Sequence, residues 1–436
     1  AYDTGFNTNT NVSLQGGNDR TQFYASASYK YNKGTTPRNT FNRLSFLGKA
    51  SQKVGNIVTV DFSVNFTQSQ PRNAPLNIGE YFANSTFPRE YDVNRYRNLY
   101  KGEHGGLASE RYGDLYRAVP GKELWWSIFE NDYKQTETMF RPVLNINIQA
   151  LPWLQLSTGG SLNYYAIDGE LKAPGSGYAN EGGSYALSHT HTTQENLYLA
   201  ANLNYQINKD WEVHGFLREE YFNQYAQYNS ESTNGGLIVP NQFFIKNSKQ
   251  QASFNAYKFN TKRIVSTIFM IGTSWKNQLF LDITGRNDWS SALVYSYGTG
   301  NFSYFYPSVS GSWIITETFK DKLPKWVSFA KVRGSWAQVG NDTSPYYINS
   351  GYSVATYQRG DKKIYGMTIP ENMKSTNLKP ERKNAWEVGL DWRFFDSRIG
   401  VDLTYYKENT RNQIMTINVP WESGVKEKLV IYRTQV

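Results

Sequence analysis

Cysteine is absent from the 436 residues of the chain, so disulfides, cysteine-ligated zinc sites and iron–sulfur clusters are excluded. Long apolar runs are absent as well, because the longest is the five residues Leu197–Ala201, which cannot form a membrane-spanning helix. The segment Ala1–Thr10 has neither the basic nor the apolar stretch of a signal peptide, and we expect none. Histidine occurs only 4 times, which leaves few candidates for imidazole chemistry.

Charge and aromatic content narrow the class of protein further. The 46 basic residues exceed the 37 acidic ones and give a net charge of +9, while Phe, Trp and Tyr make up 16% of the chain. An aromatic content this high argues against intrinsic disorder. Basic and acidic residues are interleaved along the polar segment 68–135, so neither sign forms a patch and we expect no nucleic-acid partner.

Apolar and polar residues alternate with period two in many parts of the chain. The clearest examples are the stretches Val58–Phe66, Leu144–Ala150, Leu197–Ile207 and Trp386–Phe394. A helix would scatter these residues over all its faces, whereas a strand places the apolar side chains on one face and the polar ones on the other. The sequence therefore predicts an all-β protein.

Short and long connections alternate between these predicted strands. Tight turns rich in Asn, Asp, Gly and Pro are predicted at 16–19, 53–56, 151–153, 208–210, 276–277 and 395–398. Long polar loops are predicted at 68–135, 166–193, 223–251, 286–303 and 340–384. Roughly fourteen strands of about ten residues fit between these connections, which is the length of a tilted membrane-spanning strand. This pattern of short periplasmic turns and long extracellular loops predicts an antiparallel transmembrane β-barrel of the outer membrane.

Aromatic residues gather near both ends of the predicted strands, as in the two girdles of a membrane barrel. Beside the short turns lie Trp153, Trp211, Trp275, Trp313 and Trp326, and beside the long loops lie Tyr29, Tyr31, Tyr164, Tyr165, Tyr221, Phe222, Tyr304, Tyr306, Tyr405 and Tyr406. The ordinary preference of aromatic residues for strands is the alternative explanation. The polar strand positions would line a wet lumen, and they include Asn145, Asn147, Gln149, Glu212, His214, Arg218, Glu220, Asp282, Arg286, Asp391 and Arg393. A lumen of this kind suits a polar solute.

Several motifs, in the same order along the chain, resemble the SusC/RagA family of TonB-dependent outer-membrane transporters. They are VSLQGGN at Val12–Asn18, GRNDWSSAL at Gly285–Leu293, YPSVSGSW at Tyr306–Trp313, KVRGSW at Lys331–Trp336, LKPER at Leu378–Arg382 and WEVGL at Trp386–Leu390. Each motif alone is weak, because strand and turn patterns recur in many barrels. Together, with their spacing, they cover most of the chain.

This resemblance implies a barrel of about 22 strands with a plug inside it. It also implies a SusD-like surface lipoprotein as a lid, coupling to a TonB-type protein through the plug, and active import of an oligosaccharide or oligopeptide. The outer membrane of a Gram-negative bacterium is the implied location, and a dimer of transporter–lid pairs is compatible with the resemblance. No cofactor and no catalytic residue are implied.

The chain departs from the family pattern at both ends. It starts where barrel strands begin, and about fourteen of the expected 22 strands fit within it. We therefore expect residues 1–436 to be part of one transmembrane β-barrel domain, with the N-terminal plug and the C-terminal strands outside this chain. A complete fourteen-stranded barrel, acting as a passive porin-type diffusion channel, is the alternative.

Loop aromatics are the candidate ligand-binding residues, because flat rings stack on sugars or pack on peptide side chains. The candidates are Tyr112, Tyr116, Trp125 and Trp126 in the longest loop and Trp289 after the strand that carries the GRNDWS motif. The alternative is that these rings pack the loop on itself or against a lid protein.

Catalytic and metal-binding patterns are scarce. His189 and His191 would share one face of an extended segment, but they fall in a predicted loop whose nearest acid is Glu195, so we expect solvated histidines and no metal site. The neighbours Glu219 and Glu220 would point to opposite faces of a strand and could not act as an acid–base pair. We expect no enzymatic activity.

Overall fold

The computed structural model describes residues 2–73, 94, 97–108, 121–320, 322–360, 362–375 and 378–432. Within them, one antiparallel sheet of 14 strands dominates, and each strand pairs with the strand that precedes or follows it in the sheet. In spatial order the strands are β1 (Phe6–Gly17), β2 (Thr21–Lys33), β3 (Thr40–Val54), β4 (Val58–Arg72), β5 (Asp132–Leu151), β6 (Leu154–Ala173), β7 (Ser184–Gln206), β8 (Trp211–Leu237), β9 (Ser248–Trp275), β10 (Leu279–Ser290), β11 (Ser303–Ile314), β12 (Val327–Asn341), β16 (Glu381–Phe394) and β17 (Ile399–Arg411).

The remaining elements belong to the connections. They are β13 (Ser353–Arg359), β14 (Lys362–Thr368), β15 (Asn372–Met373), β18 (Gln413–Asn418) and β19 (Glu427–Tyr432), the helices α2 (Lys122–Phe129) and α3 (Ile315–Thr318), and the 3-10 turns η3 (Tyr178–Asn180), η4 (Ile245–Asn247), η5 (Ser291–Leu293) and η6 (Trp421–Ser423). No helix in the described part of the chain has the length and apolar composition needed to span a bilayer.

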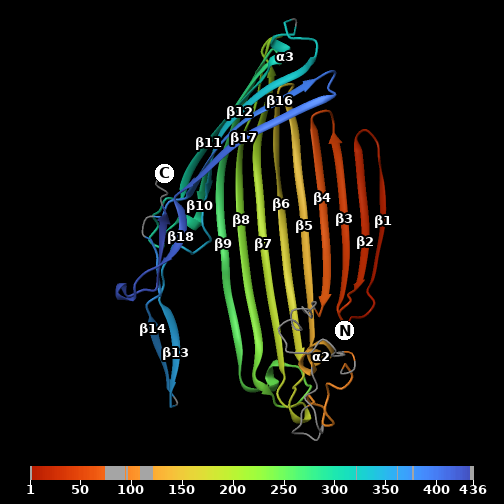
Figure 1. Cartoon of the computed structure of the whole chain (residues 1–436), viewed down its shortest axis with the longest axis vertical. Helices are drawn as coiled ribbons and strands as arrows, with labels where there is room; N and C mark the ends of the chain where they lie inside the picture. Colours follow the sequence, from red (N-terminus) through yellow and green to blue (C-terminus); the bar gives the residue numbers. More distant parts are fainter. Residues whose placement is uncertain are drawn as a thin grey trace.

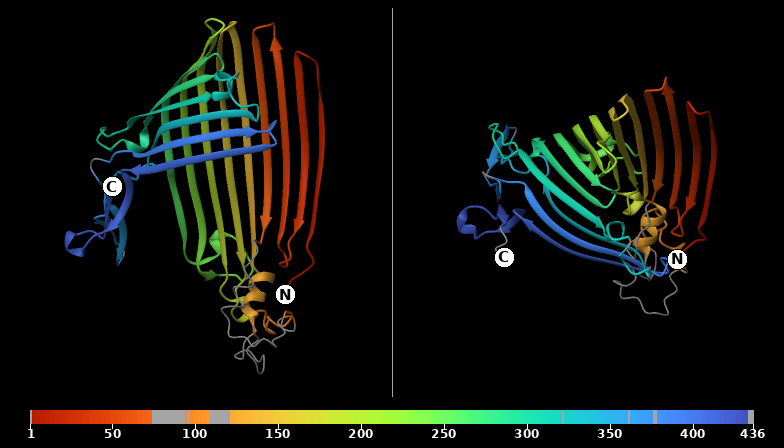
Figure 2. Two further views of the ribbon diagram at one scale, coloured as in Figure 1. Left: turned by 45° about the horizontal axis from the view of Figure 1, so that its top comes forward. Right: turned by 90° about the horizontal axis from the view of Figure 1, so that it is seen from above.

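The large sheet curves strongly and forms a trough, which is visible from the side and from above (Figures 1 and 2). The short turns lie at one end, and the long connections with α2 and the N-terminus lie at the other end (Figure 1). The strand count, the antiparallel order and the sorting of connections by length confirm the predicted barrel architecture. Among the described residues, β1 and β17 are the two edges of the sheet.

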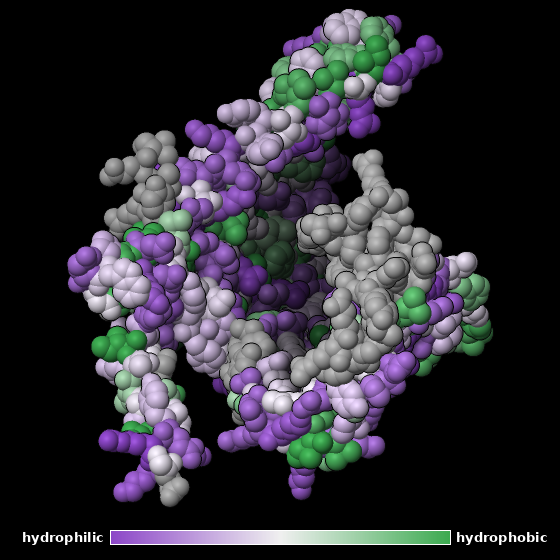
Figure 3. All heavy atoms as spheres, turned by 60° about the horizontal axis from the view of Figure 1, so that its bottom comes forward, coloured by the Kyte–Doolittle hydropathy of each residue, from purple (hydrophilic) through white to green (hydrophobic). Residues whose placement is uncertain are grey.

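The alternation of residue types explains which face of the sheet is which. In β7, Leu197 and Leu199 are 57% and 61% exposed although they are large and apolar. The same face of the neighbouring strand β8 carries Leu217, which is 53% exposed, and Tyr221, with Glu219 between them opposite Leu199. We call this the outer face, and its contiguous apolar surface is typical of contact with lipid. A view into the trough from the loop end shows a largely hydrophilic inner surface (Figure 3).

Tryptophans at the short-turn end occupy the outer face, as the girdle prediction requires. Trp211, Trp275 and Trp313 follow one another in register across β8 to β11, with Leu279 of β10 between the last two. The rings of Trp211 and Trp275 lie 6.3 Å apart. An indole at this level places its apolar body in the bilayer and its N–H toward the headgroups.

Two predictions about strand length were wrong. The strands are 12 to 28 residues long rather than about ten, and most of the predicted loops 166–193 and 223–251 belongs to β6, β7, β8 and β9. Above the bilayer both faces of a strand meet water, so polar residues occupy both faces and the alternation disappears from the sequence. Paired strands continue there because backbone hydrogen bonds need no apolar face.

The long connections that follow β10, β12 and β17 form a small hydrophobic core of their own. Tyr295, Ile348, Leu378 and Leu429 come from four different segments and are buried together. The hydroxyl of Tyr295 donates to the carbonyl of Ser375 at 2.8 Å and accepts from the amide of Leu378 at 2.8 Å. The hairpin β13–β14 projects from this core (Figure 1).

Candidate functional site

A row of charged side chains crosses the inner face of the sheet from β8 to β10. Arg218 and Glu220 lie two residues apart on β8, and Arg286 and Asp288 lie two residues apart on β10, so each pair shares a face. Arg218 Nε is 2.7 Å from Glu220, Glu220 is 3.5 Å from Arg286, and Arg286 Nε is 2.7 Å from Asp288. The charges alternate in sign, so the row is neutral as a whole.

Tyrosines extend this row on both sides. The guanidinium of Arg218 lies 4.0 Å from the ring centroid of Tyr198 on β7. On the other side, Tyr306 of β11 donates its hydroxyl hydrogen to Asp288. We call Tyr198, Arg218, Glu220, Arg286, Asp288 and Tyr306 the inner polar row. It presents ring faces and hydrogen-bonding groups next to each other.

A second polar cluster lies where the inner face meets the loops. Lys262 Nζ is 2.6 Å from Oδ1 of Asp342, the residue that follows β12, and Ser290 donates to the other oxygen of the same carboxylate. The side chain of Asp342 is only 9% exposed. This carboxylate therefore fixes the start of the β12–β16 connection to β9 and β10.

Glycines create contacts between strands that are not direct neighbours. Gly159 of β6 stands between Asn145 of β5 and Tyr198 of β7, and the hydroxyl of Tyr198 donates to Asn145 Oδ1 at 2.9 Å across it. A Cβ on Gly159 would lie 2.6 Å from that Oδ1 atom and 2.5 Å from the backbone oxygen of Leu144. A glycine in a strand often marks such a close approach.

The same arrangement recurs twice on the inner face. Gly272 of β9 stands between His214 of β8 and Asp282 of β10, whose side chains are 3.2 Å apart. Further along the sheet, Gly389 of β16 lets Arg333 reach across from β12 and donate to Thr404 of β17 at 2.7 Å. A Cβ on Gly389 would lie 2.4 Å from Arg333 Nε.

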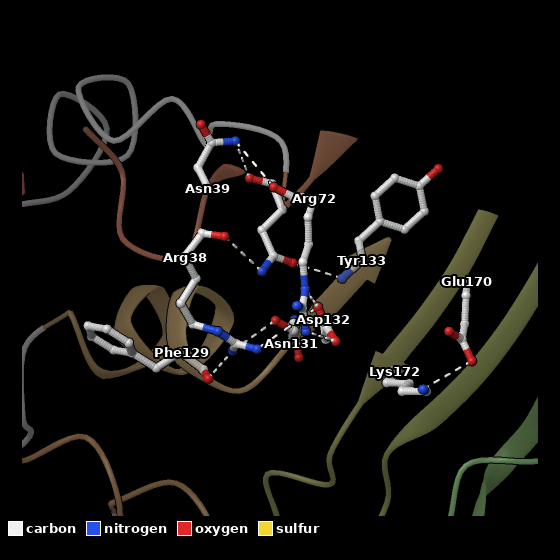
Figure 4. A network of polar contacts seen from close by, with 10 residues as sticks. Arg38, Asn39, Arg72, Phe129, Asn131, Asp132, Tyr133, Glu170 and Lys172 are labelled. Carbon is white, nitrogen blue, oxygen red and sulfur yellow. Dashed lines mark hydrogen bonds and ion pairs between the residues drawn. The ribbon is translucent and has the colours of Figure 1, made fainter. Parts of the chain in front are cut away.

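The long β4–β5 connection is tied to the strand ends by arginines (Figure 4). Arg72 at the end of β4 makes two hydrogen bonds to the carboxylate of Asp132 at the start of β5, at 2.7 and 2.6 Å. Arg38 in the β2–β3 loop donates to the carbonyl oxygens of Phe129, the last residue of α2, and of Asn131, two residues later. Two arginines therefore hold α2 at the loop end of the sheet.

The described remainder of this connection packs around α2. Tyr100 donates to Glu130 at 2.6 Å, and burial together with this carboxylate raises the pKa of the phenol above its ordinary value. Arg97 bonds to Asp3, ahead of β1, at 2.9 Å, and this hydrogen bond lowers the pKa of the Asp3 carboxyl below 3.8. The guanidinium of Arg97 also lies 5.7 Å from the ring centroid of Trp125.

The candidate ligand-binding aromatics lie in different surroundings. Tyr112 and Tyr116 fall outside the described residues. Trp125 and Trp126 belong to α2 and are 0% and 6% exposed, with Phe129 stacked 5.8 Å from Trp125. Trp289 is 39% exposed and shares the outer face with Leu281 and Ile283, away from the inner polar row. Ligand binding by these rings stays a prediction.

The histidines are not where the sequence predicted them. His189 and His191 belong to β7 instead of a loop, and the acid nearest to His189 is Asp168 of β6, its partner in register, instead of Glu195. The register between β6 and β7 places Asp168 beside His189. This register could not be deduced from the sequence, because the alternation of apolar and polar residues is lost in this segment. Among the described residues, no three histidine or acidic side chains form a set of metal ligands.

Sequence reasoning missed several members of these clusters, among them Asp288, Tyr198, Lys262, Ser290 and Asp342. Asp288 lies two residues after Arg286 on the same strand, so alternation could have predicted its place in the row. Tyr198 could not have been found, because it reaches the row across a strand pairing. Asp342 follows β12, where a loop was predicted, and gave no local signal.

Comparison with known proteins relates this chain to TonB-dependent receptors. The family description "TonB dependent receptor-like, beta-barrel" matches residues 1–426. A TonB-dependent receptor of Formosa agariphila is 22% identical over 438 residues, which is 97% of this chain and 41% of that protein. The TonB-dependent receptor SusC of Bacteroides thetaiotaomicron is 28% identical over 165 residues, which is 36% of this chain and 16% of SusC.

Solved structures show the same fold. The structure of the RagAB peptide transporter superposes with a TM-score of 0.76 at 16% identity, over 97% of this chain and 46% of that chain. The unliganded ferric citrate transporter FecA superposes with a TM-score of 0.53 at 11% identity, over 94% of this chain and 49% of FecA. The chain spans less than half the length of these relatives. These matches confirm the resemblance to SusC/RagA proteins, and the chain belongs to the TonB-dependent receptor β-barrel family.

Proposed function

We propose that this chain forms part of the barrel wall of an outer-membrane importer. The importer takes up a polar oligomer, either an oligosaccharide or an oligopeptide. The observation that carries the proposal is the inner polar row, which offers charges of both signs and tyrosine rings on the hydrophilic face of a membrane sheet. The family is one of transporters and receptors, and the proposal assigns no catalytic residue.

The composition of the row favours a solute that is neutral or zwitterionic. Arg218 and Arg286 are each balanced by a carboxylate within 3.5 Å, so the row carries no net charge with which to attract an ion of one sign. A sugar hydroxyl or a peptide amide can accept from the guanidinium groups and donate to the carboxylates. Tyrosine faces add contact area for either class of oligomer.

We further propose that import is active, with a plug and further barrel strands outside this chain. The plug would couple to a TonB-type protein, and a SusD-like lipoprotein would cover the mouth. The support is the family relationship, together with relatives that are more than twice as long as the matched region. RagAB, which shares the fold, is described as a peptide importer, and this favours testing peptides alongside glycans.

The test is uptake by cells that carry the full-length protein, with labelled mixtures of oligosaccharides and oligopeptides. We expect Arg286→Gln to reduce uptake, because it breaks the row between Glu220 and Asp288. The matched control is Arg393→Gln, which removes another inner-face arginine outside the row. Equal uptake by both variants and their parent, at equal surface abundance, would contradict a role for the row.

A passive porin-type channel is the alternative, and energy dependence separates the two. Active import stops when a protonophore collapses the proton gradient or when the TonB-type protein is deleted. Diffusion through an open channel continues under both treatments.

A further inference from the structure

The outer face of the β6–β7 hairpin carries a cluster of histidines that lies outside the inner polar row. His189 and His191 lie two residues apart on β7, on the same face as Leu197 and Leu199, and β6 and β7 pair without a register shift. The two imidazole rings are 5.5 Å apart between centroids. Two rings on alternate strand positions can turn one nitrogen each toward a common point above the sheet.

Asp168 orients one of these rings. Its carboxylate contacts Nδ1 of His189, and because a carboxylate can only accept, the proton must sit on Nδ1. The lone pair of His189 is then on Nε2, which points away from Asp168. Histidines that bind metals characteristically donate their other N–H to a carboxylate in this way, and the carboxylate fixes the tautomer and strengthens the ligand.

Aromatic neighbours restrict the second ring. The ring of His191 lies 5.6 Å from Tyr225 of β8 and 6.4 Å from Tyr164 of β6, measured between centroids. Two other acids lie close by. Glu170 is already engaged by Lys172 at 3.1 Å and by the hydroxyl of Tyr185 at 3.0 Å, and Glu231 of β8 lines the same pocket as Asp168 and His189. The two imidazoles are therefore the nitrogen donors of the cluster, and the carboxylate of Glu231 is the oxygen donor beside them.

The cluster lies outside the bilayer. His191 is fifteen residues from the end of β7 at Gln206, which is about 50 Å along a strand. Even with a tilt of about 45°, this distance exceeds the hydrocarbon thickness of about 30 Å. An ion from the medium can therefore reach the histidines without entering lipid.

We propose that His189 and His191 bind a divalent transition-metal ion, Zn²⁺ or Cu²⁺, with Asp168 as the positioning residue. Imidazole is a preferred ligand of these ions, whereas Mg²⁺ and Ca²⁺ prefer oxygen ligands. With two protein nitrogens, the other coordination positions are left to water, so the site is exchangeable.

The experiment is equilibrium dialysis of the full-length protein in detergent against ZnCl₂. We expect one Zn²⁺ per chain, lost in His189→Ala and in His191→Ala. Asp168→Asn should weaken binding by about 10- to 100-fold, which is typical when the carboxylate partner of a ligating histidine is removed. CuCl₂ should bind more tightly than ZnCl₂, following the usual order of these ions.

His214→Ala is the matched control, because His214 also contacts an aspartate, Asp282 at 3.2 Å, but no second histidine lies beside it among the described residues. This variant should bind Zn²⁺ like the parent. Unchanged binding in the His189→Ala/His191→Ala double variant would overturn the site, and unchanged affinity in Asp168→Asn would overturn the role of Asp168. Displacement of Zn²⁺ by equimolar Ca²⁺ would also overturn the proposal, since it would indicate an oxygen site. Heat-modifiable migration of each variant on a gel checks that its barrel is folded.

Discussion

Leu281 and Asp282 are neighbours on β10, but their side chains meet different surroundings. Leu281 is 44% exposed on the outer face, whereas Asp282 contacts His214 on the inner face. In a membrane, the first position faces lipid and the second faces water. A charge at the first position has no partner, since its register neighbours are Thr273 and Gly311.

We expect Leu281→Arg to impair barrel assembly, because a lipid-facing Arg costs about 2–4 kcal/mol at the bilayer midplane. The same change at Asn202, on the inner face of β7, should be tolerated. Leu199→Arg is a less sharp test, because Glu219 lies opposite Leu199 and can pair with the new charge. Assembly is measured by heat-modifiable migration on a gel, and equal tolerance at positions 281 and 202 would contradict the assignment of faces.

Asp3 gives a prediction about pH. Its pKa is lowered from 3.8 by the hydrogen bond from Arg97, so the bond stabilises the fold fully above pH 3.8 and is lost as the pH falls through the lowered pKa. We expect hydrogen exchange in residues 97–108 to accelerate at pH values below 3.8, after correction for the intrinsic rate. In Asp3→Asn this acceleration should be absent, and its persistence there would show that another group is responsible.

At the scale of elements, α2 depends on contacts from outside its own segment. Its eight residues are too few for a stable isolated helix, and no side chain caps its N-terminus at Gly121. Buried aromatic packing and the two hydrogen bonds from Arg38 compensate for this. Hydrogen exchange in α2 therefore measures whether the contacts of Arg38 with the end of this helix are intact.

We expect Arg38→Ala to raise the hydrogen-exchange rate of residues 122–129 by on the order of tenfold, since bonds from a charged donor contribute about 1.5–3 kcal/mol. Arg38→Lys should recover only part of the protection, because one ammonium cannot reproduce the guanidinium fork. Exchange in residues 199–206 of β7, at the short-turn end of the sheet, should stay unchanged in both variants. Uniform acceleration over the whole sheet would mean that Arg38 stabilises the barrel rather than the loop.

The elements also show which parts of the structure could be predicted. Val58–Phe66 alternates clearly, so its strand and its faces were correct, because lipid on one side and water on the other impose the pattern. Segment 166–193 meets water on both faces and carries no pattern, so the prediction of a loop there is wrong. The pairing of Asp168 with His189 and the loop core around Tyr295 depend on register and tertiary packing, which leave no local signal.

At the scale of the whole molecule, length is the quantity to measure first. The chain of 50.0 kDa matches 41% of one curated relative and 42% of another. We expect the polypeptide extracted from outer membranes to have an intact mass far above 50.0 kDa, with plug residues ahead of Ala1. A mass of 50.0 kDa with Ala1 at the N-terminus would instead favour the passive channel.

The three bridging glycines have a mechanical consequence for the molecule. Strands two apart in a flat sheet are about 9–10 Å from each other. The bonds across Gly159, Gly272 and Gly389 join such strands on the inner face only, so they shorten the inside of the arc relative to the outside. Strand number and shear determine the radius of a closed barrel, and these contacts favour curvature of the wall toward the side on which a solute would pass.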